Sequence, residues 1–417
     1  MSTISRRTVL TATAATAALG AVSACSSGGG ATTTRPGSDG GPATGTPGAS
    51  QSPVKGTPIG DGSTADTGAQ PHQPTAEKLK PGEAPPQFVV FSWDGAGATD
   101  DGQFARFLKI AEEHRASMTF FLSGIYTLPK EKSSLYHPPQ HPVGASDIPF
   151  LSDNAVRNTV KLISQAWLAG HEIGTHFNGH FCSSRADHNG VNKWSPEDWE
   201  SEIQQAVSFV TQWRTNTGFT DVDPLPFDYR KELIGGRTPC LEGQKALLPT
   251  AAKLGWKYDA SSPGGLQMWP QKVQDGKIWD FPLQGIPFPG HNFQVLSMDY
   301  NILANQSGGS TKGDPGKYGQ WRDQARDAYL AGFNRAYTTN RAPFFVGNHF
   351  EQWNGGIYMD AVEETIKQIA DKPDVRLVSF KQLVAWLEAQ DQSTLRKLRT
   401  LNVGQAPAGG WQAFLGG

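Results

Sequence analysis

The stretch Phe88-Val89-Val90-Phe91-Ser92-Trp93-Asp94-Gly95 decides the fold of this 417-residue chain. Its mostly apolar, β-rich residues predict a buried strand, and Asp94-Gly95 predicts the turn that ends the strand. Asp94 is therefore expected at the end of a strand. By itself, an aspartate in this position is equally well explained as a turn or cap residue.

Strands and helices alternate along the rest of the chain. Amphipathic periodicity predicts helices over residues 104–114, 156–169, 196–215, 243–254, 321–337, 358–370 and 380–389. Short apolar runs predict strands over residues 118–123, 171–175, 257–260, 278–281, 344–346 and 375–379. This alternation favours an α/β protein built on a parallel sheet or barrel.

The first 25 residues have the pattern of an export signal. Ser5-Arg6-Arg7-Thr8-Val9-Leu10 is a twin-arginine pattern, and a weakly apolar stretch then leads to Val22-Ser23-Ala24-Cys25, which resembles a lipobox. We expect export by the twin-arginine route and lipidation of Cys25, which would anchor the protein to the outer face of the cell membrane. A cleaved signal peptide with a chance cysteine is the alternative.

Composition divides the remaining chain into three parts. Residues 26–85 are dominated by Gly, Ser, Thr, Pro and Ala, so we expect a disordered linker there. Residues 86–400 are long enough for a sizeable core, and residues 401–417 are expected to form a C-terminal tail. The net charge of −2 gives no support for a nucleic-acid partner. Apolar runs long enough to span a bilayer do not follow the signal, so membrane contact is expected only through the lipid anchor.

Two histidines follow the predicted strand at residues 171–175. His176-Phe177-Asn178-Gly179-His180 spaces the imidazoles at i and i+4, which would place both on one face of a helical turn. Two histidines and one carboxylate with an open position form a catalytic zinc pattern, and Asp94 is the candidate carboxylate. The spacing alone is weak, because two polar residues in a loop produce it as well.

Together these motifs resemble the NodB-like polysaccharide deacetylases, metal-dependent esterases that remove N-acetyl groups from chitin-type or peptidoglycan sugars. The resemblance covers most of residues 86–390. Its motifs are residues 91–95 for TFDDG, residues 118–122 for ATFF, residues 176–180 for H-[ST]-x-x-H, residues 236–240 for RxP, residues 279–282 for the fourth motif and residues 347–349 for the last. Residues 339–344 look like the animal-type chitin deacetylase branch. The family implies a distorted, incomplete (β/α) barrel with the site at the C-terminal ends of its strands.

The resemblance also implies roles for single residues. Asp94, His176 and His180 would bind a divalent metal, most simply zinc, which polarises the acetamide carbonyl and acidifies bound water. His349 would be the general acid that protonates the leaving amine. Arg237 would orient the catalytic carboxylate, with Asp280 as its weakest-matched holder. Without the family pattern, a structural histidine and an ordinary ion pair would explain His349 and Arg237.

Two positions depart from the family pattern: Phe177 replaces the hydroxyl residue of the H-[ST]-x-x-H motif, and the second departure affects the chemistry directly. The residue before the metal-binding aspartate is a second aspartate in the family, the general base, and here it is Trp93. Because tryptophan cannot accept a proton, the usual water-activating group is missing, which costs typically about 10²–10⁴-fold in rate. Asp100 and Asp101, or Glu351, are candidate replacements. Asp100 and Asp101 are better explained as turn or N-cap residues, because the distance from Asp101 to residues 118–122 is too short for the family register.

Cysteine usage agrees with export. Without Cys25, the chain keeps Cys182 and Cys240, an even pair in an oxidising compartment. In the family fold both would approach the site, so we expect a disulfide that links the second and third motif loops. Two unpaired buried thiols are the alternative.

Two classes of function follow from these observations. The first is a lipid-anchored hydrolase that deacetylates an extracellular or cell-wall amino-sugar polymer. Trp256, Trp269, Trp279 and Trp353 are candidates for sugar stacking, although core packing is expected for most tryptophans. The second is a catalytically silent relative that keeps the metal and binds glycan, which Trp93 favours. An esterase acting on another acyl group shares the same site. We expect a monomer.

Overall fold

The computed structural model describes residues 56–98, 102–183 and 189–416. The predicted export signal, Cys25, residues 26–55 of the predicted linker, Asp100 and Asp101 lie outside these residues. Within the described residues, no helix combines the length and apolar character that a bilayer crossing requires.

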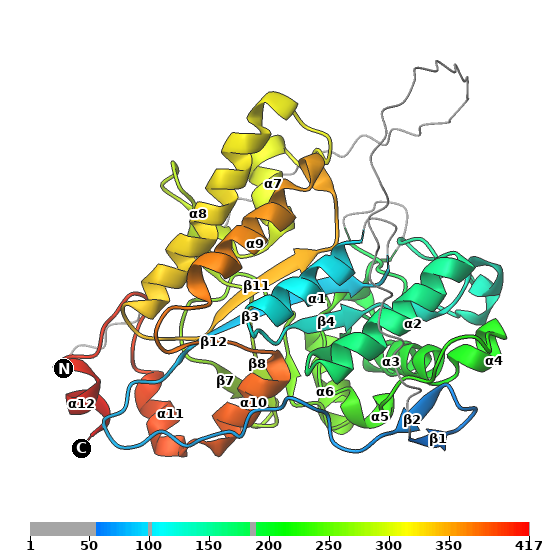
Figure 1. Ribbon diagram of the computed structural model, residues 1–417, viewed down its shortest axis with the longest axis horizontal. Helices are drawn as coiled ribbons and strands as arrows, with labels where there is room; N and C mark the ends of the chain where they lie inside the picture. The colour runs from blue at the N-terminus through cyan, green and yellow to red at the C-terminus, as the bar shows by residue number, and fades with distance from the viewer. Residues whose placement is uncertain (1–55, 99–101, 184–188, 417) are drawn as a thin grey trace, which may run out of the picture. The chain divides into compact units, whose positions relative to one another are not determined.

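A parallel five-stranded sheet forms the centre of the fold (Figure 1). Its order is β11-β3-β4-β5, with β12 paired to the beginning of β3. The strands are β3 (Gln87–Ala96), β4 (Thr119–Leu122), β5 (Glu172–Thr175), β11 (Phe344–His349) and β12 (Val375–Leu377). The predicted α/β fold with a parallel sheet is therefore confirmed. Because all pairs are parallel, the C-terminal ends of these strands meet at one edge.

Further segments continue the sheet toward an incomplete barrel. Thr175 at the end of β5 bridges in parallel to Gly236, and the Ala260 amide donates to the Gly236 carbonyl at 3.0 Å. On the opposite edge, Met298 bridges in parallel to Gly347 of β11. Between these edges lies a three-stranded sheet, β6-β8-β7, with β6 (Tyr258–Asp259), β7 (Gln271–Val273) and β8 (Ile278–Asp280). The antiparallel pair β9 (Gly285–Pro287) and β10 (Gln294–Leu296) follows.

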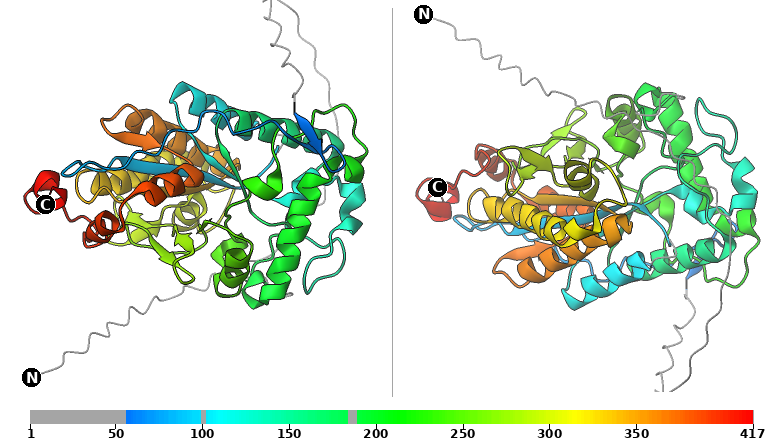
Figure 2. Two further views of the ribbon diagram at one scale, coloured as in Figure 1. Left: turned by 90° about the horizontal axis from the view of Figure 1, so that it is seen from below. Right: turned by 90° about the horizontal axis from the view of Figure 1, so that it is seen from above.

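Helices connect the strands, and the views in Figures 1 and 2 show α1, α8 and α9 along one side of the central sheet. All the predicted helices are present, at slightly shifted bounds. The helices are α1 (Gln103–Glu113), α2 (Asp153–Leu168), α3 (Pro196–Thr211), α4 (Trp213–Thr217), α5 (Tyr229–Glu232), α6 (Gln244–Lys253), α7 (Asp299–Ser307), α8 (Tyr318–Tyr337), α9 (Ile357–Ile369), α10 (Phe380–Ala389), α11 (Gln392–Leu398) and α12 (Gly410–Leu415).

Two apolar clusters share the central strand. The outer cluster includes Val89, Phe91 and Trp93 and reaches helices α1, α2, α8 and α9. The inner cluster includes Phe88 and Val90 and fills the barrel together with aromatic residues of β6, β8, β11 and α10. Odd and even residues of β3 thus face different cores, as the two-residue period of a strand requires.

The predicted linker ends too late in the sequence. Residues 56–85 include β1 (Thr57–Ile59) and β2 (Thr64–Asp66) and then run along the domain as a strap toward the C-terminal helices (Figure 1). The Ser63 carbonyl accepts from Trp213 Nε1 at 2.7 Å, and Gln70 Nε2 donates to the carbonyls of Trp167 and His171. These hydrogen bonds help to offset the entropy that residues 56–85 lose when they become ordered, because their composition provides few apolar side chains to bury.

The predicted C-terminal tail also packs onto the domain. Leu401 is buried, and the Asn340 side chain donates to the Asn402 carbonyl at 3.1 Å. Trp411 and Phe414, on α12, pack against the inner cluster. The folded unit therefore extends from residue 56 to residue 416, beyond the predicted bounds of 86 and 400.

Candidate active site

The inner face of β3 changes from apolar to polar at its C-terminal end. Phe88 and Val90 belong to the inner cluster, and Ser92 and Asp94 continue the same face because side chains alternate along a strand. Ser92 Oγ and Asp94 Oδ1 both accept hydrogen bonds from Nη1 of Arg237, at 2.9 Å and 2.8 Å. Asp94 therefore lies at the polar end of the otherwise apolar barrel interior.

Trp93 lies on the opposite face of the strand. Its ring packs against Phe107, Phe120 and Phe350, with centroids 4.7 Å, 5.6 Å and 5.5 Å away, and no part of it reaches solvent. The interpretation that Trp93 takes the place of a general base is therefore wrong, because this side chain belongs to the outer core. The resemblance correctly identified the strand, but it aligned Trp93 with the general base of the family, and Trp93 lies on the face of the strand that points away from Asp94.

Arg237 reaches Asp94 across the barrel interior, from the segment that continues the sheet beyond β5. It follows Gly236, which continues the sheet beyond β5, and its guanidinium lies 4.9 Å above the Phe121 ring. The Arg237 side chain is fully buried, and its Nε donates to the Ala260 carbonyl at 2.9 Å. The predicted role of Arg237 as the group that orients a carboxylate is consistent with this geometry, and the carboxylate that it holds is Asp94.

Asp94 is held in its ionised form. Burial alone would raise the pKa of Asp94, but the Arg237 guanidinium, followed by His176 and His349, outweighs burial and lowers that pKa. Asp94 therefore carries a negative charge at neutral pH although it is almost completely buried.

Asp280 does not hold Arg237. Among the described residues, no hydrogen bond joins the two side chains, and the carboxyl of Asp280 interacts with Ser262. Asp280 instead lines a separate cavity of about 310 Å³, which contains none of Asp94, His176, His180 or His349. The other lining residues of this cavity are Leu266, Met268, Trp269, Pro270, Gln271, Pro282, Phe345 and Arg399.

The two histidines of residues 176–180 lie on an irregular turn. The predicted helical turn is wrong, because Phe177 and His180 adopt left-handed backbone conformations with φ of 60° and 57°. Glu202 of α3 fixes the turn: its Oε1 accepts from the Asn178 amide at 3.0 Å, and its backbone carbonyl accepts from the Asn178 side chain. The turn still brings the two imidazoles together, with ring centroids 5.0 Å apart.

Both imidazoles are neutral. Nδ1 of His176 donates to the Arg237 carbonyl at 2.8 Å, so the lone pair is on Nε2, which is buried and has no hydrogen-bond partner among the described residues. Burial lowers the pKa of His176, and burial with the neighbouring His176 and His349 lowers the pKa of His180 to about 3. An oriented, neutral imidazole with a free buried nitrogen is suited to bind a cation or a donor group of a substrate.

His349 ends β11 and is held by an aspartate that the sequence motifs do not include. Oδ1 of Asp299 lies 2.8 Å from His349 Nδ1, and Oδ2 accepts from the His349 amide at 2.7 Å. Burial alone would lower the pKa of His349, but Asp299, with smaller contributions from Asp94 and Glu351, raises it to about 9. His349 is therefore protonated at neutral pH, as its predicted role of general acid requires.

Asp299 could not be found from the sequence because it precedes His349 by 50 residues and lies in no recognised motif. It is the first residue of α7, just after Met298 bridges to Gly347. Of the other proposed bases, Glu351 is exposed and close enough to contribute to the raised pKa of His349.

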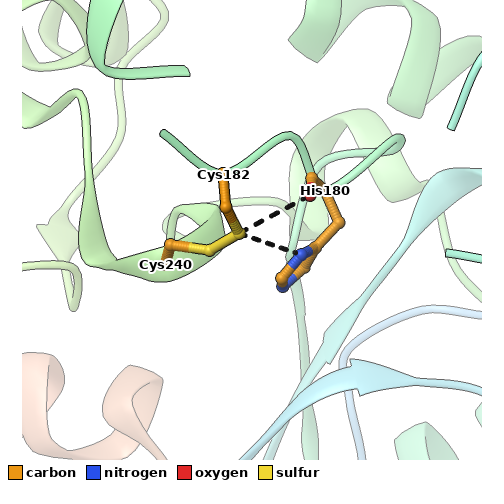
Figure 3. Close-up of side chains that lie close together, drawn as sticks. All are labelled: His180, Cys182 and Cys240. Atoms are coloured by element: carbon orange, nitrogen blue, oxygen red, sulfur yellow. Dashed lines mark hydrogen bonds between the residues drawn. A yellow bond between two sulfur atoms is a disulfide. The ribbon is translucent and has the colours of Figure 1, made fainter. Parts of the chain in front are cut away.

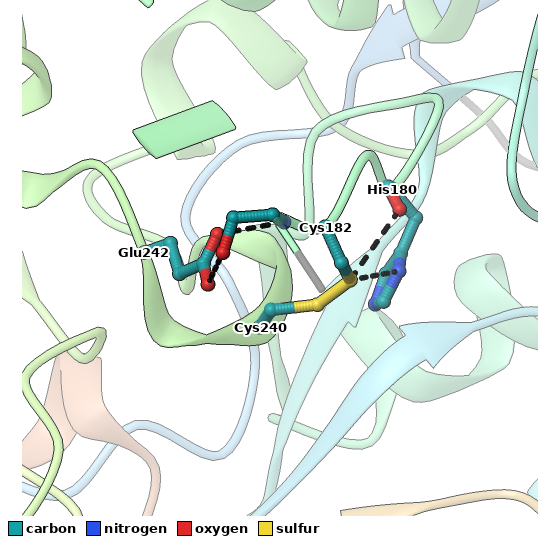
Figure 4. The surroundings of a disulfide bond; sticks show 5 residues. His180, Cys182, Cys240 and Glu242 are labelled. Carbon is teal, nitrogen blue, oxygen red and sulfur yellow. Dashed lines mark hydrogen bonds between the residues drawn. A yellow bond between two sulfur atoms is a disulfide. The ribbon is translucent and has the colours of Figure 1, made fainter. Parts of the chain in front are cut away.

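A disulfide joins Cys182 and Cys240, as predicted, with a Cα–Cα distance of 5.8 Å (Figure 3). Nδ1 of His180 lies 3.6 Å from Cys182 Sγ. A second link runs beside the disulfide, because both the amide and the hydroxyl of Ser183 donate to Glu242 (Figure 4). The loop that carries His180 is therefore fastened to the loop that follows Arg237.

Of the four tryptophans named for sugar stacking, one is at the site. Trp353 is partly exposed, and its ring lies 5.2 Å from the His349 ring and 5.8 Å from that of Tyr300, which is 42% exposed. Trp256, Trp269 and Trp279 are buried and serve as core residues.

The three residues expected to bind a metal, Asp94, His176 and His180, do not form a cluster of close ligand atoms. One cluster of potential metal ligands is found in the part of the chain that the structure describes. It consists of His180, Cys182 and Cys240, whose ligand atoms lie within 4.8 Å of one another. Both sulfurs of this group are joined in the disulfide. Asp94, His176 and His180 do not form a second group of this kind, and Oδ1 of Asp94 is already bonded to Arg237. A zinc ion on these three residues stays a prediction of the resemblance.

Comparison with known proteins gives a likeness in fold. No family model matches this sequence, and no curated protein matches it. The structural neighbours include a Mycobacterium smegmatis protein described as a polysaccharide deacetylase, with 17% identity, a TM-score of 0.45, and coverage of 75% of this chain and 95% of that one. They also include the Bacillus subtilis peptidoglycan deacetylase PdaC, with 11% identity, a TM-score of 0.37, and coverage of 76% and 96%.

A third neighbour carries a name of another kind. PuuE allantoinase has 12% identity and a TM-score of 0.45, with coverage of 77% of this chain and 98% of that one. At these identities and scores the likeness concerns the course of the chain alone. What the site can do follows from its own side chains.

Proposed function

We propose that the protein is a hydrolase that removes acetyl groups from an amino-sugar polymer of the cell wall or of chitin type. The observation that supports this most directly is the pairing of opposite charges on neighbouring strands: ionised Asp94 lies near the C-terminal end of β3, and protonated His349 ends β11. The two residues are register partners in the parallel sheet. A carboxylate and an imidazolium at one site suit acid–base hydrolysis of an acyl bond.

His349 supplies the proton that an amine leaving group needs. An amide does not release a free amide anion, so its nitrogen must be protonated as the carbon–nitrogen bond breaks. The Asp299 carboxylate holds the His349 ring by Nδ1, which leaves Nε2 to donate toward the substrate. Asp299 also stabilises the imidazolium, so that the donor is charged before the substrate arrives.

An aromatic pair beside His349 supports a sugar substrate. Trp353 and Tyr300 lie edge to face with partly exposed rings next to the acid. Aromatic faces bind the apolar face of a pyranose ring, and the phenol can reach a hydroxyl group. Residues 339–344 resemble the animal-type chitin deacetylases, and we include a chitin-type substrate in this proposal for that reason.

Acetate release from chitooligosaccharides and from peptidoglycan fragments, followed by enzymatic assay and mass spectrometry, tests the proposal. We expect release by the wild-type protein, strong loss in His349→Ala, and retention in Trp93→Phe. The glycan-binding alternative would be favoured by tight oligosaccharide binding without any acetate release. The esterase alternative would be favoured by release from acylated sugars with an oxygen ester and none from N-acetyl groups.

We further propose that the protein is exported by the twin-arginine route and is held at the outer face of the membrane by lipid on Cys25. The support is the sequence pattern alone. Metabolic labelling with a radioactive fatty acid tests it: the label should follow the wild-type protein and be lost in Cys25→Ala. Equal labelling of both proteins would contradict it.

A further inference from the structure

We propose that Asp94 is the general base of the reaction and that Gly95 occupies the place of the missing metal-binding carboxylate, so that hydrolysis proceeds without a tightly bound divalent cation. This inference rests on the proposed hydrolase function. It follows from three observations: the partner of Arg237, the ion pairs already formed at the site, and the residue that follows Asp94.

The hydrogen bond of Arg237 indicates to which of the two family aspartates, the general base or the metal ligand, Asp94 corresponds. The family resemblance gives this arginine the task of orienting the catalytic carboxylate, which the family places one residue before the metal-binding aspartate. In this chain the fully buried Arg237 donates to Asp94 at 2.8 Å and to Ser92 on the same strand face. Asp94 therefore fills the position of the base, and the next residue, Gly95, falls at the position of the ligand.

The Asp94 carboxylate already has a buried cationic partner. Arg237 Nη1 lies 2.8 Å from Asp94, and His349 Nδ1 lies 2.8 Å from Asp299. A dication would add two uncompensated charges beside a buried guanidinium, which is costly in a medium of low dielectric constant.

Gly95 offers no ligand but has room for one. It forms the irregularity in the pairing of β3 with β4 and adopts φ of +64°. A Cβ atom built on it would have its nearest neighbours at 3.8 Å and 3.9 Å, from Ser123 and Tyr126, which are ordinary contact distances. Any side chain is strained at this φ, and aspartate and asparagine tolerate the left-handed conformation better than most residues, so these two are the substitutions to compare.

The reaction balances with these groups alone. Water attacks the acetamide carbonyl carbon and gives one proton to the Asp94 carboxylate as the carbon–oxygen bond forms. The carbon–nitrogen bond then breaks, and the nitrogen takes a proton from the His349 imidazolium. The products are acetic acid and the free amine, and transfer of the proton from Asp94 back to His349 restores the site. The buried Nε2 of His176 is available to position the substrate or the water.

Metal binding tests this inference without reference to activity. The wild-type protein, grown with zinc and dialysed without a chelator, should contain far less than one zinc per chain by elemental analysis. Even an outer-shell change alters metal affinity by roughly 10–100-fold, so Gly95→Asp should bind Zn²⁺ at least about 100-fold more tightly than the wild type in calorimetry. Gly95→Asn is the matched control and should stay close to the wild type. The gain should disappear in Gly95→Asp combined with His176→Ala.

Activity gives the second test. Acetate release by the wild type should be unchanged by a strong chelator and should fall by about 10²–10⁴-fold in Asp94→Asn. One zinc per wild-type chain that is lost in Asp94→Asn would overturn the inference, as would activity that a chelator abolishes and zinc restores. If no substrate releases acetate, the proposed function fails, while the zinc content of the wild type still decides the role of Asp94. The same measurement decides it if Gly95→Asp does not fold.

Discussion

Nη1 of Arg237 lies 2.8 Å from Oδ1 of Asp94, and neither side chain has appreciable contact with solvent. The pair joins β3 to the segment after β5 that contains Gly236, across the interior of the barrel. Because the two charges are buried, each depends on the other for compensation.

Removal of Arg237 is therefore expected to destabilise the fold as well as the site. Loss of one partner of a buried pair costs about 3–5 kcal/mol, so Arg237→Ala should lower the free energy of unfolding in urea by that amount. Lys231→Ala, at an exposed lysine, is the control and should change stability by less than about 0.5 kcal/mol. Equal stability of Arg237→Ala and the wild type would show that the pair is not formed.

Trp93→Asp should unfold the protein and should not improve catalysis. The change places a carboxylate among Phe107, Phe120 and Phe350 and removes a large side chain, for a combined loss of more than about 4 kcal/mol. Trp93→Phe keeps an aromatic ring and removes an indole N–H that has no partner in the described chain, so about 1–2 kcal/mol is expected. Urea unfolding measures both. A folded and more active Trp93→Asp variant would restore the interpretation that Trp93 stands at the position of the general base.

Asp299→Asn should change the pH dependence of His349. The raised pKa of about 9 means that the imidazole keeps its proton through neutral pH and loses it as pH rises through about 9. Without the carboxylate, the pKa should fall toward the ordinary value of about 6.5, because burial lowers it and only the smaller contributions of Asp94 and Glu351 still raise it. NMR titration of the labelled His349 ring measures the shift directly. The alkaline limb of the rate profile should move to lower pH with it, and an unmoved titration would contradict the pairing.

Trp353→Ala should weaken polymer binding more than chemistry. Its ring lies beside His349 and is not bonded to the acid, so the expected effect is a higher KM with a smaller change in kcat. Aromatic contacts of this kind contribute about 0.5–1.5 kcal/mol, or roughly 2- to 12-fold in KM. Trp279→Phe, in the core, is the comparison and should leave KM unchanged. An equal effect on a small acetyl ester would argue against a sugar-binding role.

The disulfide should stabilise the domain substantially. Cys182 and Cys240 enclose a loop of 58 residues, for which the chain-entropy estimate is about 4 kcal/mol. Cys182→Ser with Cys240→Ser should lose that much stability in urea. Alkylation of the oxidised, denatured wild type should add no label at either cysteine, and two added labels would show that the bond is absent.

Much of the fold was predictable because its signals are local. Hydrophobic periodicity placed the helices close to their observed bounds, and the short apolar runs placed the strands of the central sheet. The face of Trp93 also follows from the period of a strand, since Trp93 shares the face of Phe91 and Asp94 falls on the opposite face. The family motif, applied residue by residue, hid that alternation.

Other features depend on contacts between distant segments. Asp299 meets His349 only because Met298 closes the barrel against Gly347. The left-handed turn at Phe177 and His180 is fixed by Glu202 from a helix beyond it, and no spacing rule distinguishes this turn from a helical one. The order of residues 56–85 likewise depends on carbonyl groups and side chains more than 90 residues away.

That strap has a practical consequence for anyone who shortens the protein. A version starting at residue 86 would discard Ser63, Gln70 and Leu79, the partners of Trp213 Nε1, of the Trp167 and His171 carbonyls, and of the Gln390 side chain. In such a shortened protein, these polar groups of α2, α4, the residue before β5 and the end of α10 would lose their partners, which favours aggregation. Recombinant work should therefore begin at residue 56.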